Sequence, residues 1–123
     1  MSAAESRFLG LHVLADDGPS WRNDPVEQAR AACRAGAEVI QLRAKHATDG
    51  VALSWAREIR SETRRSAALF FVNDRFDLAL AAEADGVHLG QEDIAPARIP
   101  PALRKHLLVG RSTHTLGQAR EAA

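Results

Sequence analysis

Two cationic side chains follow one another closely at the end of an apolar segment of the sequence. In the stretch 39–43, Val-Ile-Gln-Leu-Arg, alternate residues of a strand point to opposite sides, so Gln41 and Arg43 share one side. Lys45 comes two residues later. Two cations at one strand end suggest a site for an anion such as phosphate or pyrophosphate. The residues alone leave an equal alternative, in which these cations form a solvated rim and pair with nearby acids.

Two aspartates also stand at predicted strand ends. The apolar stretch 69–72 runs into Asn73 and Asp74, and the stretch 87–89 is followed by Asp93. Because parallel α/β sheets carry their functional groups at the carboxyl ends of strands, neighbouring parallel strands would place Asp74 and Asp93 in one pocket. Asp74 also stands at or near the cap of the next predicted helix, where an aspartate is ordinary. Asp93 lies in a loop without such a capping role.

Apolar strands and amphipathic helices alternate along the chain, and this alternation predicts a parallel sheet. Asp24 and Pro25 predict the start of the first helix, and Gly36 predicts its end. Three prolines between residues 94 and 105 predict that any helix there is short or broken. The predicted strands are residues 9–15, 39–43, 69–73, 87–89 and 107–110, and the longest predicted helix is 51–65.

A last helix is predicted to open at Thr115 and to turn Leu116 and Ala119 inward, and no stop signal closes it before residue 123. A (β/α)8 barrel has eight strands and typically about 250 residues. We therefore predict an α/β fold, a partial (β/α)8 TIM barrel with about the first five strands and without the C-terminal strands. Residues 1–123 would form a single incomplete domain. The alternative is a complete flavodoxin-like sheet, which also has five parallel strands.

Charge and cysteine content narrow the class of protein. The 123 residues carry 16 basic and 16 acidic side chains, and the formal net charge is zero. This balance gives no support for bulk electrostatic binding to nucleic acid or to a membrane surface. The N-terminus lacks the apolar core of a signal peptide, and no apolar run is long enough to span a bilayer. With Cys33 as the single cysteine, we expect a cytoplasmic protein without disulfides.

Four segments of the sequence resemble the thiamine-phosphate synthase family. They are Val-Ile-Gln-Leu-Arg-Ala-Lys at 39–45, Val-Asn-Asp-Arg-Phe-Asp-Leu-Ala-Leu at 72–80, Ala-Asp-Gly-Val-His-Leu-Gly-Gln-Glu-Asp at 84–93 and Val-Gly-Arg-Ser-Thr-His-Thr at 109–115. Their order and spacing also fit the family, and the resemblance covers nearly the whole chain from about Leu9 onward. The family fold is a (β/α)8 barrel, so the resemblance implies the fold that the strand count predicts.

The resemblance implies an Mg²⁺-dependent transferase of thiamine biosynthesis. Such an enzyme joins hydroxymethylpyrimidine diphosphate to a thiazole phosphate and releases pyrophosphate. The resemblance implies that Asp74 and Asp93 bind the metal, and it assigns no certain role to His88 or Arg111. The implied substrate contacts are Arg43, Lys45 and Asn73 at the pyrophosphate, and Gln41 and Ser112 around the pyrimidine and its leaving group. Ser112 and Lys45 would act catalytically without a covalent protein nucleophile.

Two other functions stay open at this point. The parent protein could be a thiazole tautomerase of the same fold, which would need acid-base groups rather than Mg²⁺ and pyrophosphate. The chain could instead be a non-catalytic binding or assembly module whose exposed strand edge pairs with a second copy, as a homo-oligomer. Barrel phosphate sites are frequently built by the loops after strands seven and eight. We therefore expect the 123-residue chain alone to be inactive or very weakly active.

Overall fold

The computed structural model describes residues 10–91 and 93–122. In these residues five strands form one parallel sheet, and each strand pairs with its neighbour in the sequence. The strands are β1 (His12–Asp16), β2 (Val39–Arg43), β3 (Leu69–Asn73), β4 (Gly86–Leu89) and β5 (Leu108–Arg111). The helices are α2 (Pro25–Arg34), α3 (Asp49–Ser66), α4 (Phe76–Ala81), the 3-10 helix η1 (Pro96–Arg98), α5 (Pro101–Arg104) and α6 (Leu116–Ala122).

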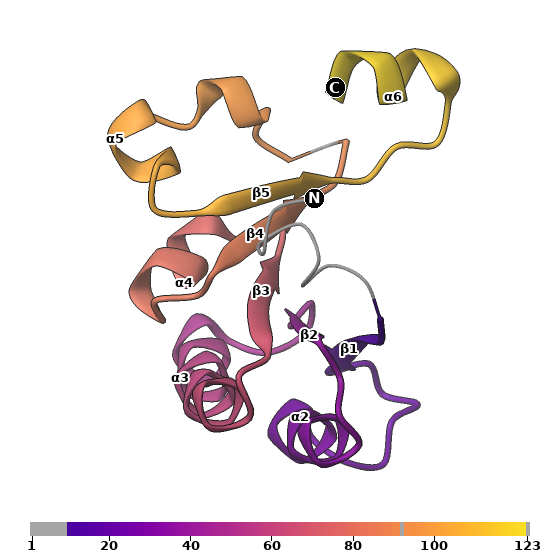
Figure 1. The fold of residues 1–123 in the computed structure, drawn as a ribbon, viewed down its shortest axis with the longest axis vertical. Helices are drawn as coiled ribbons and strands as arrows, with labels where there is room; N and C mark the ends of the chain where they lie inside the picture. The colour runs from indigo at the N-terminus through magenta and orange to yellow at the C-terminus, as the bar shows by residue number, and fades with distance from the viewer. Residues whose placement is uncertain (1–9, 92, 123) are drawn as a thin grey trace.

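The strand order decides between the two predicted folds. A flavodoxin-like sheet has the order 2-1-3-4-5, with helices on both faces. Here the order is β1-β2-β3-β4-β5, the arrangement of consecutive strands in a (β/α)8 barrel. In Figure 1 the sheet curves, and α2, α3 and α4 line one side of it. The prediction of a partial barrel with its first five strands is confirmed.

Local sequence signals fix the helix ends, and those of α2 are as predicted. The Asp24 carboxylate caps α2 by accepting a hydrogen bond of 2.9 Å from the Glu27 amide. Gly36 follows α2 with a φ of +87°, a conformation that glycine adopts without steric cost. The Thr48 hydroxyl caps α3 by accepting a bond from the Val51 amide. The segment with three prolines gives only η1 and the four-residue α5.

The two faces of the sheet differ in what covers them. Residues of the outer face are fully buried against the helices, among them Ile40, Leu42 and Phe70. Burial of this face supplies the hydrophobic core of the described chain. On the inner face Val39, Leu69 and Phe71 form a separate small apolar cluster. The inner face is thus apolar around the amino-terminal halves of β2 and β3, and polar residues follow toward the carboxyl ends.

The orientation predicted for the last helix is wrong. Leu116 is 68% exposed, and Ala119 is exposed as well. The predicted opening is right, because the Thr115 hydroxyl accepts a bond from the Gln118 amide. A barrel helix packs over two neighbouring strands, and among the described residues only β5 lies beside α6 (Figure 1).

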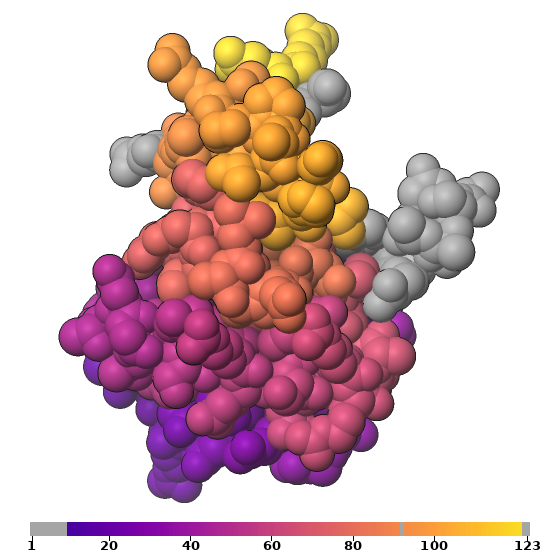
Figure 2. Space-filling model, turned by 90° about the vertical axis from the view of Figure 1, so that its left-hand side faces the viewer, coloured from indigo at the N-terminus to yellow at the C-terminus, as the bar shows by residue number. Residues whose placement is uncertain are grey.

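The space-filling view shows the outer surface of the molecule. In Figure 2 the closely packed surface of α3 and α4 forms a rounded body, and the segment from η1 to α6 stands above it as a narrower part. Among the helices of the described residues, none has the length and apolar character needed to cross a membrane.

Gly86 tests the packing of the inner face. A Cβ added there would lie 2.6 Å from the Leu108 carbonyl oxygen and 2.6 Å from the Phe71 ring. We expect Gly86→Ala to lower the free energy of unfolding by about 2 kcal/mol, since backbone and ring cannot both move away. Urea denaturation measures this change. Gly50→Ala is the control, because a Cβ at Gly50 meets no atom within 4 Å. Equal stability of the two variants would contradict the packing of Phe71 on β4.

Candidate active site

A cavity of about 420 Å³ opens on the inner face of the sheet and extends to the carboxyl ends of the strands. Four of the residues predicted for substrate contacts line it: Gln41, Arg43, Asn73 and Ser112. They come from three strands, because Gln41 and Arg43 belong to β2, Asn73 ends β3 and Ser112 follows β5, and the parallel pairing brings them to one face. The other lining residues are His12, Val13, Leu14, Val39 and His88.

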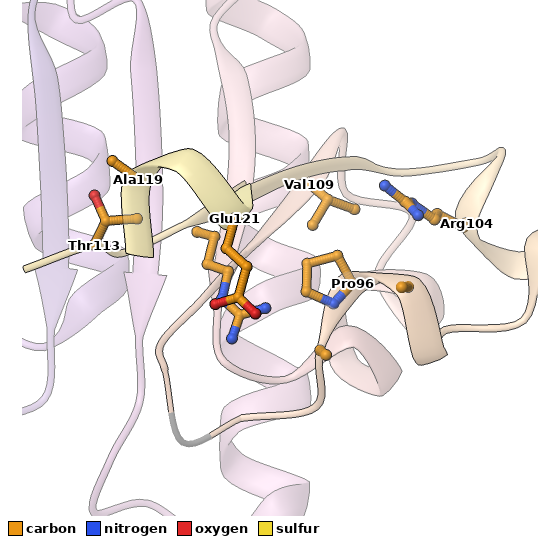
Figure 3. A pocket seen from close by; sticks show the side chains of 9 residues that line it. Pro96, Arg104, Val109, Thr113, Ala119 and Glu121 are labelled. Carbon is orange, nitrogen blue, oxygen red and sulfur yellow. The ribbon is translucent and has the colours of Figure 1, made fainter. Parts of the chain in front are cut away.

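A larger cavity of about 710 Å³ lies elsewhere, among β5, η1, α5 and α6 (Figure 3). It contains Arg104, Arg111 and the Glu121 carboxylate, but none of the residues predicted for substrate or metal. Arg111 therefore lies on the helix-covered side of β5, away from the inner cavity. The residues predicted for substrate contacts that line a cavity all line the smaller one.

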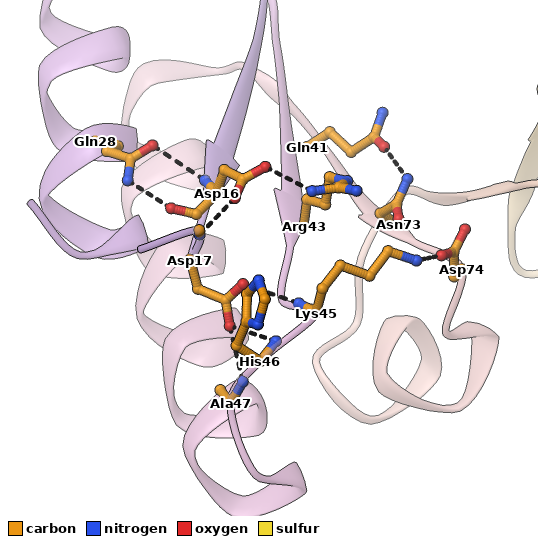
Figure 4. Close-up of polar contacts among 11 residues, drawn as sticks. Asp16, Asp17, Gln28, Gln41, Arg43, Lys45, His46, Ala47, Asn73 and Asp74 are labelled. Atoms are coloured by element: carbon orange, nitrogen blue, oxygen red, sulfur yellow. Dashed lines mark hydrogen bonds and ion pairs between the residues drawn. The ribbon is translucent and has the colours of Figure 1, made fainter. Parts of the chain in front are cut away.

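Arg43 is held at the rim of the inner cavity by an acid of the neighbouring strand. Its guanidinium donates a hydrogen bond of 2.9 Å to the Asp16 carboxylate (Figure 4). The Asp16 backbone is fixed in turn by the Gln28 side chain, which accepts a bond of 3.0 Å from the Asp16 N–H and donates one of 2.7 Å to its carbonyl. The Arg43 side chain is 41% exposed while that of Asp16 is 13% exposed. An anion can therefore reach the guanidinium without displacing Asp16 from its position.

Lys45 extends from the end of β2 to the end of β3, where its ammonium group pairs with the Asp74 carboxylate (Figure 4). The pairing of cations with acids at a rim, one of the two arrangements that the sequence left open, is thus present for both Arg43 and Lys45. Both acids stand at strand ends of the same site. The Lys45 side chain is 39% exposed, so its ammonium group also remains open to an incoming anion.

Asp74 does not cap α4, and that part of the prediction is wrong. Its φ of +67° lies in the left-handed region, which is uncommon for residues other than glycine. The N-cap position of α4 belongs to Arg75, which makes no side-chain capping bond. The Asp74 N–H donates a bond of 2.7 Å to the His88 carbonyl, and this contact stabilises the unusual backbone. The conformation turns the carboxylate toward Lys45 instead of the helix.

Asp74 and Asp93 converge on Gly90. A Cβ built at Gly90 would lie 3.1 Å from an Asp93 carboxylate oxygen and 3.9 Å from an Asp74 carboxylate oxygen. The absence of a side chain at Gly90 therefore leaves room between the two acids. The Gly90 N–H donates a bond of 2.7 Å to the Asp93 carboxylate and sets its direction. Among the described residues, no three His, Cys, Asp or Glu side chains lie together as a metal site.

This arrangement fits Mg²⁺ better than a metal held by protein alone. Mg²⁺ takes oxygen ligands and is usually bound by one or two carboxylates together with substrate phosphates. Asn73, the residue before Asp74, offers a further oxygen: its Oδ1 is buried and accepts no hydrogen bond from the described residues, while its Nδ2 donates a bond of 2.8 Å to Gln41. Leaving a buried polar atom without a partner costs free energy, so this oxygen is available to a bound ligand.

Comparison with known proteins identifies the family. A family profile described as thiamine monophosphate synthase matches residues 11–123. The chain belongs to the thiamine monophosphate synthase family.

Individual proteins similar to this chain carry related names. The thiamine-phosphate synthase of Anaeromyxobacter dehalogenans is 46% identical over 117 residues, which are 95% of this chain and 50% of the relative. That of Synechococcus sp. (strain WH7803) is 45% identical over 88% of this chain and 30% of the relative. The solved thiamine phosphate pyrophosphorylase from Pyrococcus furiosus has a TM-score of 0.83 and 38% identity, over 93% of this chain and 55% of that one. This family member thus spans about half, or less, of the length of these relatives.

Ser112 and His88 form a hydrogen-bonded pair in the inner cavity. The Ser112 hydroxyl and the His88 Nε2 lie 2.7 Å apart, and the Ser112 carbonyl accepts a bond of 2.6 Å from Gln91. Gly110 makes room for the imidazole, because a Cβ there would lie 2.7 Å from its Nδ1. Burial lowers the pKa of His88, so the neutral ring faces the serine.

The sequence did not reveal the part played by Asp16 and Asp17, whose run Asp-Asp-Gly-Pro predicts only a turn. Asp16 pairs with Arg43, and the Asp17 carboxylate accepts three backbone hydrogen bonds from the loop after β2. Burial raises the pKa of Asp17, but the bonds from His46, Ala47 and Lys45 outweigh it, and the pKa lies below its ordinary value. Their place at the end of the first predicted strand was the one feature of the sequence that could have indicated a role at the site.

The lowered pKa of His88 gives a pH-dependent stability. The unfolded chain binds a proton at His88 more tightly than the folded protein does, so the free energy of unfolding should fall as the pH drops below about 6.5. We expect His88→Gln to remove this component between about pH 7 and about pH 5. Urea denaturation at both pH values measures it. His106→Gln, at an exposed position, is the control and should keep the dependence. An unaltered dependence in His88→Gln would contradict a half-buried imidazole that is neutral in the folded protein.

Proposed function

We propose that this chain forms the diphosphate- and metal-binding part of a thiamine-phosphate synthase. The reaction joins hydroxymethylpyrimidine diphosphate to a thiazole phosphate and releases pyrophosphate. The observation that carries the proposal is the meeting of two cations and two carboxylates with the amides of Gln41 and Asn73 at one edge of the sheet. Membership of the family and the names of the similar proteins support it.

Asp74 and Asp93 are the proposed Mg²⁺ ligands, with the substrate diphosphate supplying further oxygens. When bound, Mg²⁺ would neutralise negative charge on the departing pyrophosphate. Lys45 pairs with the Asp74 Oδ2, while the Asp74 Oδ1 lies toward Gly90. The ammonium group would repel a metal at the same carboxylate, and it could exchange Asp74 for the bound diphosphate. Arg43 is already directed to the same rim.

The remaining residues hold the reactants. Arg43, Lys45 and Asn73 contact the diphosphate, while Gln41 and Ser112 contact the pyrimidine and its leaving group. The bond between the pyrimidine methylene carbon and the diphosphate oxygen breaks, and its electron pair leaves with pyrophosphate. The thiazole nitrogen then donates its lone pair to the methylene carbon. Catalysis is therefore charge stabilisation and positioning, in which Lys45 and Ser112 act without a covalent intermediate.

The geometry supports a synthase more than the two alternatives. A thiazole tautomerase needs acid-base groups, and the His88–Ser112 pair is of that kind. A tautomerase has no use for two carboxylates around Gly90 beside two cations. A non-catalytic assembly module would leave the same four charges unexplained. The cytoplasm as location and a homo-oligomer as assembly remain our proposals, the former on the single cysteine of the sequence.

The pairing of Lys45 with Asp74 predicts opposite effects on two ligands. Without the ammonium group, Mg²⁺ meets no competitor at Asp74, so Lys45→Met should bind Mg²⁺ about threefold to tenfold more tightly. The same variant should bind pyrophosphate about tenfold more weakly, because one charge-assisted contact is lost. NMR titration of the chain with each ligand measures both constants. Lys105→Met, at an exposed position of the chain, is the matched control. Weaker Mg²⁺ binding by Lys45→Met would contradict the proposed exchange.

The complete reaction can be tested in a chimera. This chain would be joined to the part of the Pyrococcus furiosus relative that it does not match, since the match covers 55% of that relative. We expect Mg²⁺-dependent formation of thiamine phosphate from both substrates, and a loss of about hundredfold in kcat/KM for Asp93→Asn.

Asp24→Asn is the control for this loss, because asparagine caps a helix as well as aspartate does and α2 lies outside the site. A folded chimera that binds pyrophosphate but forms no product would refute the synthase assignment. Product formation that Asp93→Asn does not affect would refute the metal site only.

A further inference from the structure

The Asp17 carboxylate binds three consecutive amides of the loop that follows β2. Its Oδ1 accepts a hydrogen bond of 2.9 Å from the Lys45 N–H, and its Oδ2 accepts bonds of 2.9 Å from His46 and 2.8 Å from Ala47. Figure 4 shows the carboxylate to the left of the Lys45 amide and above the Ala47 amide, with the Lys45 side chain extending to the right, away from Asp17 and toward Asp74. One ionised side chain thus fixes the backbone on which Lys45 stands.

Asp17 is itself rigidly placed. Its N–H donates a bond of 3.2 Å to the Arg43 carbonyl, which continues the pairing of β1 with β2. The preceding residue, Asp16, is held by two bonds with Gln28 of α2. The carboxylate therefore projects from an element that is fixed to both the sheet and a helix.

The loop that Asp17 holds is short. It leaves β2 after Arg43 and reaches the cap of α3 at Thr48. The two acids at the end of β1 divide the contacts between them, because Asp16 pairs with the Arg43 side chain and Asp17 binds the backbone around Lys45. Both cations of the proposed diphosphate site are thus oriented from β1.

We propose that Asp17 is a positioning residue of the diphosphate site, which holds the loop so that the Lys45 ammonium group meets the Asp74 carboxylate and the bound diphosphate. This inference rests on the proposed function. It adds a residue that contacts no substrate and acts only through Lys45. Asp17 also differs from an ordinary loop contact, because its substitution should weaken pyrophosphate binding only when Lys45 is present.

The substitution Asp17→Asn tests the proposal with little change in shape. An asparagine has one acceptor oxygen, and its NH₂ group would face amide N–H groups that need an acceptor. We expect affinity for pyrophosphate, in the presence of Mg²⁺, to fall about tenfold. Asp24→Asn is the matched control, since Asp24 accepts one bond at the start of α2 and one oxygen suffices there. NMR titration of the full chain gives the constants, and the amide spectrum shows that each variant is folded. If Asp17→Asn is not folded, Asp17→Ser replaces it.

A double-mutant cycle separates positioning from general loosening of the loop. In the Lys45→Met background, Asp17→Asn should change pyrophosphate affinity by less than about twofold, because the group it positions is gone. The same tenfold loss in both backgrounds would overturn the proposal and leave the proposed function intact. Failure of the unaltered chain to bind pyrophosphate would overturn the proposed function and this inference with it.

Discussion

Parallel pairing of strands in sequence order is the constraint on which the rest of the site depends. Each of the five strands runs in the same direction, so all the carboxyl ends meet at one edge. The register then sets which residues face each other. Asp16 lies opposite Arg43, and Asn73 lies opposite His88. A slip of one residue in any pair would turn those side chains to the helix-covered face and remove them from the site.

Charges at this edge are balanced within the site. Arg43 and Lys45 each pair with a carboxylate of a neighbouring strand. Because the carboxylates are more buried than the cations, each acid is partly withdrawn from water and gains from a positive neighbour. Under the proposed function, a metal with its diphosphate would bring both signs of charge at once. The Lys45–Asp74 pair could then separate without leaving either group unpaired in the site.

Much of the framework could be predicted from the sequence, because it depends on local patterns. The strand 39–43 and the cap of the first helix follow from alternation and from Asp24, and the structure has both. The backbone of Asp74 could not be predicted, because its positive φ is stabilised by a carbonyl of another strand. The hydrogen bonds from the loop after β2 to Asp17 could not be predicted for the same reason, since the partners of Asp17 lie 28 to 30 residues away in the sequence. Local signals fix elements, whereas contacts between strand ends fix the orientation of the side chains that do chemistry.

The inner face also shows why chemistry is confined to one end of the sheet. Toward the amino ends of β2 and β3, Val39, Leu69 and Phe71 form an apolar cluster on the inner face, and Gly86 lets the Phe71 ring approach the backbone. Toward the carboxyl ends, Gly110 accommodates the His88 ring, and Gly90 leaves space between two carboxylates. Glycine therefore permits close packing at the amino end of the inner face and leaves space at the carboxyl end. Glycine is needed at these positions because neighbouring atoms occupy the space that a Cβ would take. The same glycines therefore allow the close packing of the sheet and set the shape of the site.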